Sequence, residues 1–243
     1  MQRRVLRFTD SESLSRAAAH ALSSAVRCAV EQRDICSLVL SGGGSPRRMY
    51  ELLAGPEFSH QIVWEKVHVF WSDERCVAPD DVRSNYYLAR TCLLEHVPLS
   101  AANIHRMYGE IDPQQAARKS AGDIRAFFGE RAFVPGHVPS FDCALLGMGA
   151  DGHVASLFSG DDSAVLEEEE LVIATRAPEG MPVAQRLSMS LPLLAAARDI
   201  FFVVCGRNKQ PMLDLVLTDS PAVQHYPAAR ICARSRTVWF VGP

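Results

Sequence analysis

The sequence predicts an α/β fold built on a doubly wound, mainly parallel sheet. Two patterns along the chain predict it. Short, continuous apolar runs of strand length recur, and amphipathic segments of helix length fill the gaps between them. Alternation of this kind is typical of right-handed βαβ units, and strands that are apolar along their whole length suit a sheet covered on both faces.

The first helix is predicted over residues 11–32, where apolar residues fall on one stripe and Asp10 or Ser11 can serve as N-cap. Further helices are predicted at 47–54, 84–95, 113–128 and 208–218. Strands are predicted at 36–40, 67–71, 141–146, 171–175, 200–205 and 237–241. No internal repeat or Ser/Gly linker divides the chain, so we expect one domain over residues 1–243.

Composition excludes several classes of protein. A net charge of -3 and a pI near 6.2 give no overall positive field for nucleic acid or anionic lipid, so we expect neither partner. The 7 cysteines are scattered, without a zinc-ligand pattern, which indicates reduced thiols and no metal. No signal peptide or membrane span is visible, and we expect a cytoplasmic protein. The acidic run 167–170 is expected to be a solvated loop.

Ligands of open α/β sheets bind beyond the carboxyl ends of the strands, and three such positions carry signals. The first is the segment Ser41-Gly-Gly-Gly-Ser45-Pro46, between a predicted strand and a predicted helix. Glycines let backbone amides turn toward one point, and Ser45 can cap the helix or bind a ligand. The segment predicts an anion cradle at a helix N-terminus. It is not a Walker loop, because no Gly-Lys-Ser/Thr follows.

The second position is Ser72-Asp-Glu-Arg75, directly after the strand predicted at 67–71. These charged residues form either an exposed turn or the mouth of a site, where Arg75 can bind a phosphate or a developing oxyanion. Arg83, Ser84 and Asn85 add polar groups near the same rim.

The third position is 147–158, which contains Gly-x-Gly-x-x-Gly, the dinucleotide fingerprint. We interpret the match as accidental, because Asp151 would place a carboxylate inside a pyrophosphate loop. Asp151 and His153 instead put an acid and an imidazole on one glycine-rich loop, where the carboxylate can orient the ring as a general base.

Together these segments resemble the 6-phosphogluconolactonase family, within the superfamily that it shares with glucosamine-6-phosphate deaminase. The resemblance rests on the three segments above and on two more, Arg186-Leu-Ser-Met-Ser-Leu-Pro192 and Gly206-Arg-Asn-Lys209. It implies a Rossmann-like, three-layer fold and a hydrolase of the oxidative pentose phosphate pathway. The chain reads Ala155-Ser-Leu-Phe158 where the deaminases carry Ala-Phe-Asn-Glu-Pro, which favours the lactonase branch.

The resemblance also implies roles for particular residues. His153 matches the general base and Asp151 its partner, and Gly43, Gly44 and Ser45 match the phosphate cradle. Basic positions around phosphate and substrate are matched by Arg75, Arg186 and Lys209, and the sequence leaves open which of them meets the phosphate. We therefore expect hydrolysis of 6-phospho-D-glucono-1,5-lactone without metal or cofactor. The oligomeric state stays open, and a monomer is compatible with the sequence.

Three other functions remain alternatives. The fingerprint at 147–158 leaves a nicotinamide-dependent oxidoreductase open, and a sugar-phosphate-binding regulator could keep the cradle without turnover. A Cys-His hydrolase is a weaker alternative, because none of the cysteines lies at a recognisable nucleophile position.

Overall fold

The computed structural model describes residues 2–129, 132–133, 138–159, 170–218 and 220–243. Within them a sheet of 7 strands has the order β1-β10-β9-β6-β2-β3-β5, and every pairing in it is parallel. Its strands are β1 Gln2–Arg7, β2 Cys36–Leu40, β3 Val67–Trp71, β5 Ile104–His105, β6 Cys143–Leu146, β9 Asp199–Cys205 and β10 Arg236–Gly242. A second, antiparallel sheet is formed by β4 Asp73–Arg75, β8 Gln185–Met189 and β7 Val172–Arg176.

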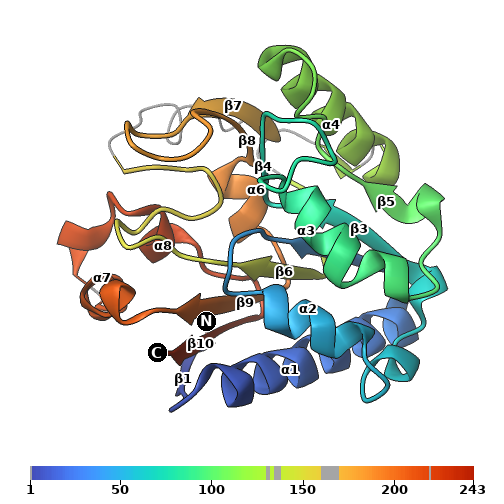
Figure 1. Ribbon diagram of the computed structural model, residues 1–243, viewed down its shortest axis with the longest axis horizontal. Helices are drawn as coiled ribbons and strands as arrows, with labels where there is room; N and C mark the ends of the chain where they lie inside the picture. Colours follow the sequence, from blue (N-terminus) through green and yellow to red (C-terminus); the bar gives the residue numbers. More distant parts are fainter. Residues whose placement is uncertain (1, 130–131, 134–137, 160–169, 219) are drawn as a thin grey trace.

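Helices cover both faces of the parallel sheet (Figure 1). One face packs against α1 Ser11–Arg33, α2 Arg47–Ala54 and α3 Asn85–Cys92. The other packs against the small sheet and against α4 Pro113–Phe128, α6 Leu191–Ala195, α7 Gln210–Val216 and α8 Pro227–Arg230. Adjacent residues of β2 show the division, because Leu38 belongs to the first core and Val39 to the second. The predicted three-layer α/β fold is confirmed.

Local sequence explains where the long helices begin. Asp10 Oδ1 accepts a hydrogen bond from the amide of Ser13 at 2.8 Å and caps α1, so Asp10 is the N-cap of the two candidates, Asp10 and Ser11. Asp112 caps α4 in the same way, and Pro113 occupies the first helical turn, where its missing N–H costs nothing. The helix predicted at 84–95 ends sooner, at Cys92, and a separate 3₁₀ turn follows at Leu94–His96.

The prediction for 171–175 is wrong in one respect. The segment is a strand, β7, but it pairs antiparallel with β8 in the small sheet. Four strands, β1, β4, β5 and β8, were not predicted from the sequence. β1 contains three arginines in six residues and still extends the large sheet, because its backbone pairs with β10. This pairing brings the first and the last strand of the chain side by side (Figure 1).

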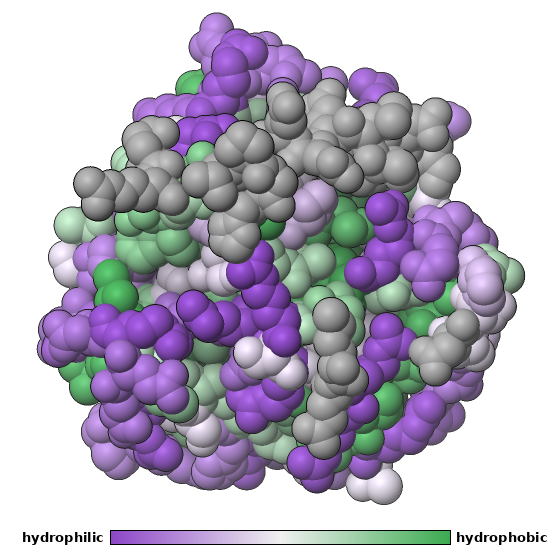
Figure 2. All heavy atoms as spheres, turned by 180° about the vertical axis from the view of Figure 1, so that it is seen from behind, coloured by the Kyte–Doolittle hydropathy of each residue, from purple (hydrophilic) through white to green (hydrophobic). Residues whose placement is uncertain are grey.

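All 7 cysteines are free. No helix in the described ranges is long and apolar enough to span a bilayer. The face seen in Figure 2 mixes hydrophilic residues with smaller apolar patches. Residues 167–169 of the predicted acidic loop lie outside the described residues.

The order of the strands indicates where a ligand site is expected. From β2 the chain winds outward through β3 to β5, then returns to the other side of β2 as β6 and winds outward again through β9 and β10. The winding direction therefore reverses between β2 and β6. Open α/β sheets bind ligands at such a reversal, beyond the carboxyl ends of the strands.

Candidate active site

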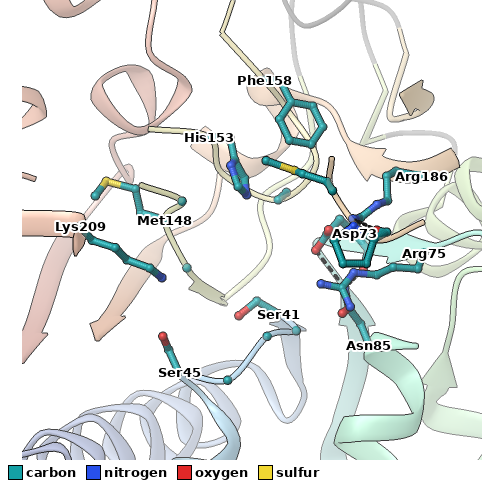
Figure 3. A pocket seen from close by; sticks show the side chains of 18 residues that line it. Ser41, Ser45, Asp73, Arg75, Asn85, Met148, His153, Phe158, Arg186 and Lys209 are labelled. Carbon is teal, nitrogen blue, oxygen red and sulfur yellow. Dashed lines mark hydrogen bonds between the residues drawn. The ribbon is translucent and has the colours of Figure 1, made fainter. Parts of the chain in front are cut away.

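A cavity of about 340 Å³ opens at this reversal, beyond the carboxyl ends of β2 and β6 (Figure 3). The predicted site residues that line it come from all five sequence segments: Gly43, Gly44, Ser45, Arg75, His153, Arg186 and Lys209. Asp151 does not line the cavity but lies directly behind His153. The structure thus brings the predicted site together around one cavity.

The glycine loop forms one wall. Ser41 at its start is held by Tyr50, whose buried hydroxyl donates to the Ser41 carbonyl at 2.6 Å. The expectation that Ser45 can cap the following helix is wrong, because the N-cap of α2 is Pro46 and no side chain caps it. The Ser45 side chain lines the cavity instead (Figure 3), where its hydroxyl lies beside the thiol of Cys205.

The loop after β6 holds an acid–imidazole pair. His153 Nδ1 and Asp151 Oδ1 are 2.5 Å apart, and this hydrogen bond lowers the pKa of Asp151 below its usual range. A carboxylate bound at Nδ1 fixes the proton on that nitrogen and leaves the lone pair on Nε2. The ring also packs against Phe158, at 5.0 Å between centroids. The arrangement suits a general base.

Gly149 makes the pair possible. A Cβ atom at this position would lie 2.2 Å from the His153 ring and 2.4 Å from Asp151 Oδ1. The residue therefore serves close packing around the histidine rather than a pyrophosphate. No helix begins in the described residues between β6 and Ser159, whereas the dinucleotide fingerprint requires one.

Two arginines form the opposite wall. Arg75 in β4 and Arg186 in β8 are direct partners across the antiparallel pair. Arg75 donates to the carbonyl of Arg83 at 2.7 Å, and Arg186 donates to the carbonyls of Val183 and Pro182 at 2.7 and 2.6 Å. Burial, together with the like charge of Arg75, lowers the pKa of Arg186.

Lys209 stands apart from the arginines, on the side of the cavity next to the glycine loop (Figure 3). It ends a 3₁₀ turn that follows β9, and burial lowers its pKa below the usual lysine value. In the described part of the chain no carboxylate pairs with it. The ammonium is thus a partly desolvated cation available to an anionic ligand.

The side chains of residues 73–75 have two different surroundings. Asp73 and Arg75 line the cavity, as one of the two interpretations required. Glu74 does not reach the mouth. It is 3% exposed and accepts hydrogen bonds from the amides of Arg75, Asn85 and Tyr86, at 2.7, 2.7 and 2.8 Å, and from the Ser84 hydroxyl at 2.9 Å. Glu74 therefore fixes the start of α3 beside the site.

Several other residues line the wall. Asp73 and Asn85, which the sequence placed near the rim without giving them a role, are among them. Met148, Met181, Pro182 and Phe158 also line the cavity. The apolar residues carry no motif of their own, and only the folded loops bring them to the site.

Fold and cavity define a class, an α/β protein with an acid–imidazole pair and three cations around one cavity at the carboxyl edge of a parallel sheet. A family model for glucosamine-6-phosphate isomerases/6-phosphogluconolactonase matches residues 9–239. The chain belongs to this family, on its 6-phosphogluconolactonase branch.

Named relatives support this placement. A 6-phosphogluconolactonase of Synechocystis is 36% identical over 214 residues, which are 88% of this chain and 84% of the relative. That of Mycobacterium tuberculosis is 34% identical over 241 residues, 96% of this chain and 93% of the relative. The crystal structure of 6-phosphogluconolactonase from Thermotoga maritima superposes with a TM-score of 0.82 at 27% identity, covering 100% of both chains.

Proposed function

We propose that this protein hydrolyses 6-phospho-D-glucono-1,5-lactone to 6-phospho-D-gluconate. The observation that carries the proposal is the His153–Asp151 pair at 2.5 Å, on a cavity that also holds a glycine loop and Lys209. The pair supplies a base, and the loop with its lysine supplies an anion site. The relatives named 6-phosphogluconolactonase support the choice of substrate.

In the proposed reaction His153 Nε2 takes a proton from a water molecule while the water oxygen bonds to the lactone carbonyl carbon. Backbone amides or Arg75 stabilise the negative charge on the carbonyl oxygen of the tetrahedral intermediate. The carbon–ring-oxygen bond then breaks, and the protonated imidazole returns its proton to the leaving ring oxygen. A δ-lactone is an activated ester, so no covalent enzyme intermediate is needed.

The phosphate supplies binding energy at a distance from the reacting carbon. We propose that the amides of Gly43 and Gly44, the Ser45 hydroxyl and Lys209 hold it, since these groups share one side of the cavity. The two arginines on the opposite wall then remain for the lactone end. Anchoring at one end places the carbonyl near His153, which lowers the entropic cost of the attack.

The proposed reaction uses no metal or cofactor. In the described residues no three His, Cys, Asp or Glu side chains gather as metal ligands. Exhaustive chelation should leave turnover unchanged. Loss of activity with EDTA and its recovery with one divalent metal would contradict this part of the proposal.

We also propose that residues 1–243 form one domain that works in the cytoplasm on a small phosphosugar lactone, with no nucleic acid or membrane partner. The parallel pairing of β1 with β10 supports a single unit, because the first and last strands share one sheet.

The experiment that tests the function follows the loss of freshly generated 6-phosphogluconolactone above its spontaneous hydrolysis. Unphosphorylated gluconolactone is the matched substrate, and we expect it to be hydrolysed far less efficiently because it lacks the anchor. A rate equal to the uncatalysed one would refute the proposal. Titration with NADP(H) tests the oxidoreductase alternative, and we expect no binding.

A further inference from the structure

Ser156 joins the loop that carries His153 to the small sheet. Its hydroxyl donates to Asp73 Oδ2 in β4 at 2.7 Å. Its amide donates to the Ser188 hydroxyl in β8 at 3.3 Å, and its carbonyl accepts from the Thr175 hydroxyl in β7 at 3.0 Å. Ser156 therefore bonds to every strand of the β4-β8-β7 sheet.

These bonds are shielded from water. Ser156 is 1% exposed, and Asp73, Thr175 and Ser188 are 6%, 5% and 0% exposed. A hydrogen bond to a buried carboxylate is charge-assisted and stronger than a neutral one. The hydroxyl of Ser156 thus contributes to a fixed attachment rather than to a solvated surface contact.

Among the described residues, the other backbone hydrogen bonds of the loop run within it or to a different part of the molecule. Gly149 donates to the His153 carbonyl at 2.9 Å, and Val154 and Leu157 exchange backbone bonds at 3.3 and 3.0 Å, all within the loop. On the opposite flank the amide of Ala228 donates to the Gly152 carbonyl at 3.1 Å. The Ala228–Gly152 bond thus holds one side of the loop, and the bonds of Ser156 hold the side next to the strands that carry the arginines.

The attachment shares its strands with the substrate-facing cations. Asp73 lies two residues before Arg75 in β4, and Ser188 lies two residues after Arg186 in β8. Residues two apart in a strand point to the same face, so the anchors and the arginines occupy one face of the small sheet. A rigid bond from this face to the loop fixes the distance from the base to the cations.

Ser156 itself stays away from the cavity. It is absent from the cavity lining, whereas its neighbour Ala155 lies there. Ala155 has a φ of 53°, a left-handed conformation that costs energy for a residue with a side chain. The hydrogen bonds of Ser156, the next residue, hold this turn in place. They explain how Ala155 keeps its strained conformation.

We propose that Ser156 is a positioning residue, which holds His153 in register with the lactone-binding wall by bonding its loop to Asp73, Thr175 and Ser188. The proposal rests on the proposed lactonase function for its kinetic consequence. Its structural content, the placement of the imidazole, does not depend on which ligand the cavity takes.

The test compares Ser156→Ala and Thr175→Val with two controls. Thr175→Ser keeps the hydroxyl that donates to Ser156. Ser190→Ala removes a buried hydroxyl, close in sequence to β8, that has no hydrogen-bond partner in the described residues. We expect kcat to fall about tenfold to a hundredfold in the first two variants, with KM and affinity for 6-phosphogluconate nearly unchanged, because base and carbonyl lose their alignment. Both controls should behave like the wild type.

A second readout reports on His153 without turnover. In ¹⁵N-histidine NMR spectra we expect the ring signals of His153 to shift or broaden in Ser156→Ala and Thr175→Val and to stay in place in both controls. Unchanged kcat and unchanged His153 signals in the two test variants would overturn the proposal, as would an equal loss in Ser190→Ala. If Ser156→Ala does not fold, the Thr175 pair decides. If the wild type does not hydrolyse the lactone, the proposed function fails and the NMR comparison alone decides the positioning role.

Discussion

Gly42, in the loop after β2, packs directly against the side chain of Asn85 at the start of α3. A Cβ atom at position 42 would lie 1.7 Å from Asn85 Oδ1, a separation that real side chains do not adopt. Asn85 Nδ2 donates in turn to the carbonyl of Asp73 at 2.9 Å. The contact therefore joins the glycine loop to the strand that carries Arg75.

Gly42→Ala should disturb both walls of the cavity, because the new methyl group must displace Asn85 and break its bond to Asp73. We expect a loss of about 1–3 kcal/mol in the free energy of unfolding, and at least a tenfold drop in kcat/KM. Gly122→Ala in α4 is the control. No atom lies within 4 Å of its Cβ, and alanine should add about 0.5–1 kcal/mol of stability there. Thermal unfolding and the lactone assay measure both effects, and a Gly42→Ala protein with wild-type values would contradict the expectation.

The parallel sheet could be predicted from sequence because its strands are buried on both faces. All five residues of β2 are buried, and four of them are apolar. β4 reads Asp-Glu-Arg and carries no such signal. It is a strand only because β8 pairs with it, from a segment more than a hundred residues later in the chain.

The site likewise contains contacts that could be predicted from the sequence and contacts that could not. Asp151 and His153 are two residues apart on one loop, so their contact could be expected from spacing alone. The bonds of Ser156 join residues 83, 32 and 19 positions apart. The sequence around Ser156 does not predict these partners, because Asp73, Thr175 and Ser188 become its neighbours only when the small sheet has formed.

Glu74→Gln tests the attachment of α3. The carboxylate accepts four hydrogen bonds from buried donors, and an amide would place its own N–H groups against some of them. We expect a loss of about 1–3 kcal/mol in unfolding free energy, since buried donors remain unsatisfied. Glu65→Gln, at an exposed position, should change it by less than about 0.5 kcal/mol. Equal denaturant midpoints for the two variants would show that Glu74 does not hold the helix.

Lys209 predicts a pH dependence of phosphosugar binding. Burial lowers its pKa, so its charge is lost at a lower pH than that of a solvated lysine. Affinity for 6-phosphogluconate should therefore decline early on the alkaline side. In Lys209→Arg the decline should disappear, because guanidinium stays protonated. Calorimetric titrations between about pH 7.5 and 10 measure this. The same alkaline decline in both proteins would assign it to another group.

Lys209→Ala removes the cation altogether. Loss of a charged hydrogen bond costs about 1.5–3 kcal/mol, so kcat/KM should fall about tenfold to a hundredfold. Lys66→Ala is the control, because Lys66 pairs with Asp34 on the surface. Unchanged kinetics in a folded Lys209→Ala protein would remove this residue from the phosphate site.

His153→Asn tests the base itself. Water is a poor nucleophile at neutral pH, so most of the chemical acceleration beyond positioning should pass through this imidazole. Asparagine keeps similar bulk and some hydrogen bonding but cannot take the proton. We expect kcat to fall about 10²- to 10⁴-fold while affinity for 6-phosphogluconate largely survives. His60→Asn, an exposed histidine outside the cavity, should keep wild-type kinetics.

The pH profile distinguishes the imidazole from its partner. The bond from His153 holds the pKa of Asp151 below its usual range, so this carboxylate stays ionised through the mildly acidic range. A decline of wild-type kcat/KM as the pH falls from neutrality would therefore not come from Asp151. His153→Asn should lose that decline along with its activity. If the variant hydrolyses the lactone at nearly the wild-type rate and keeps the acid limb, the base is another group, and Asp151 is the next residue to replace.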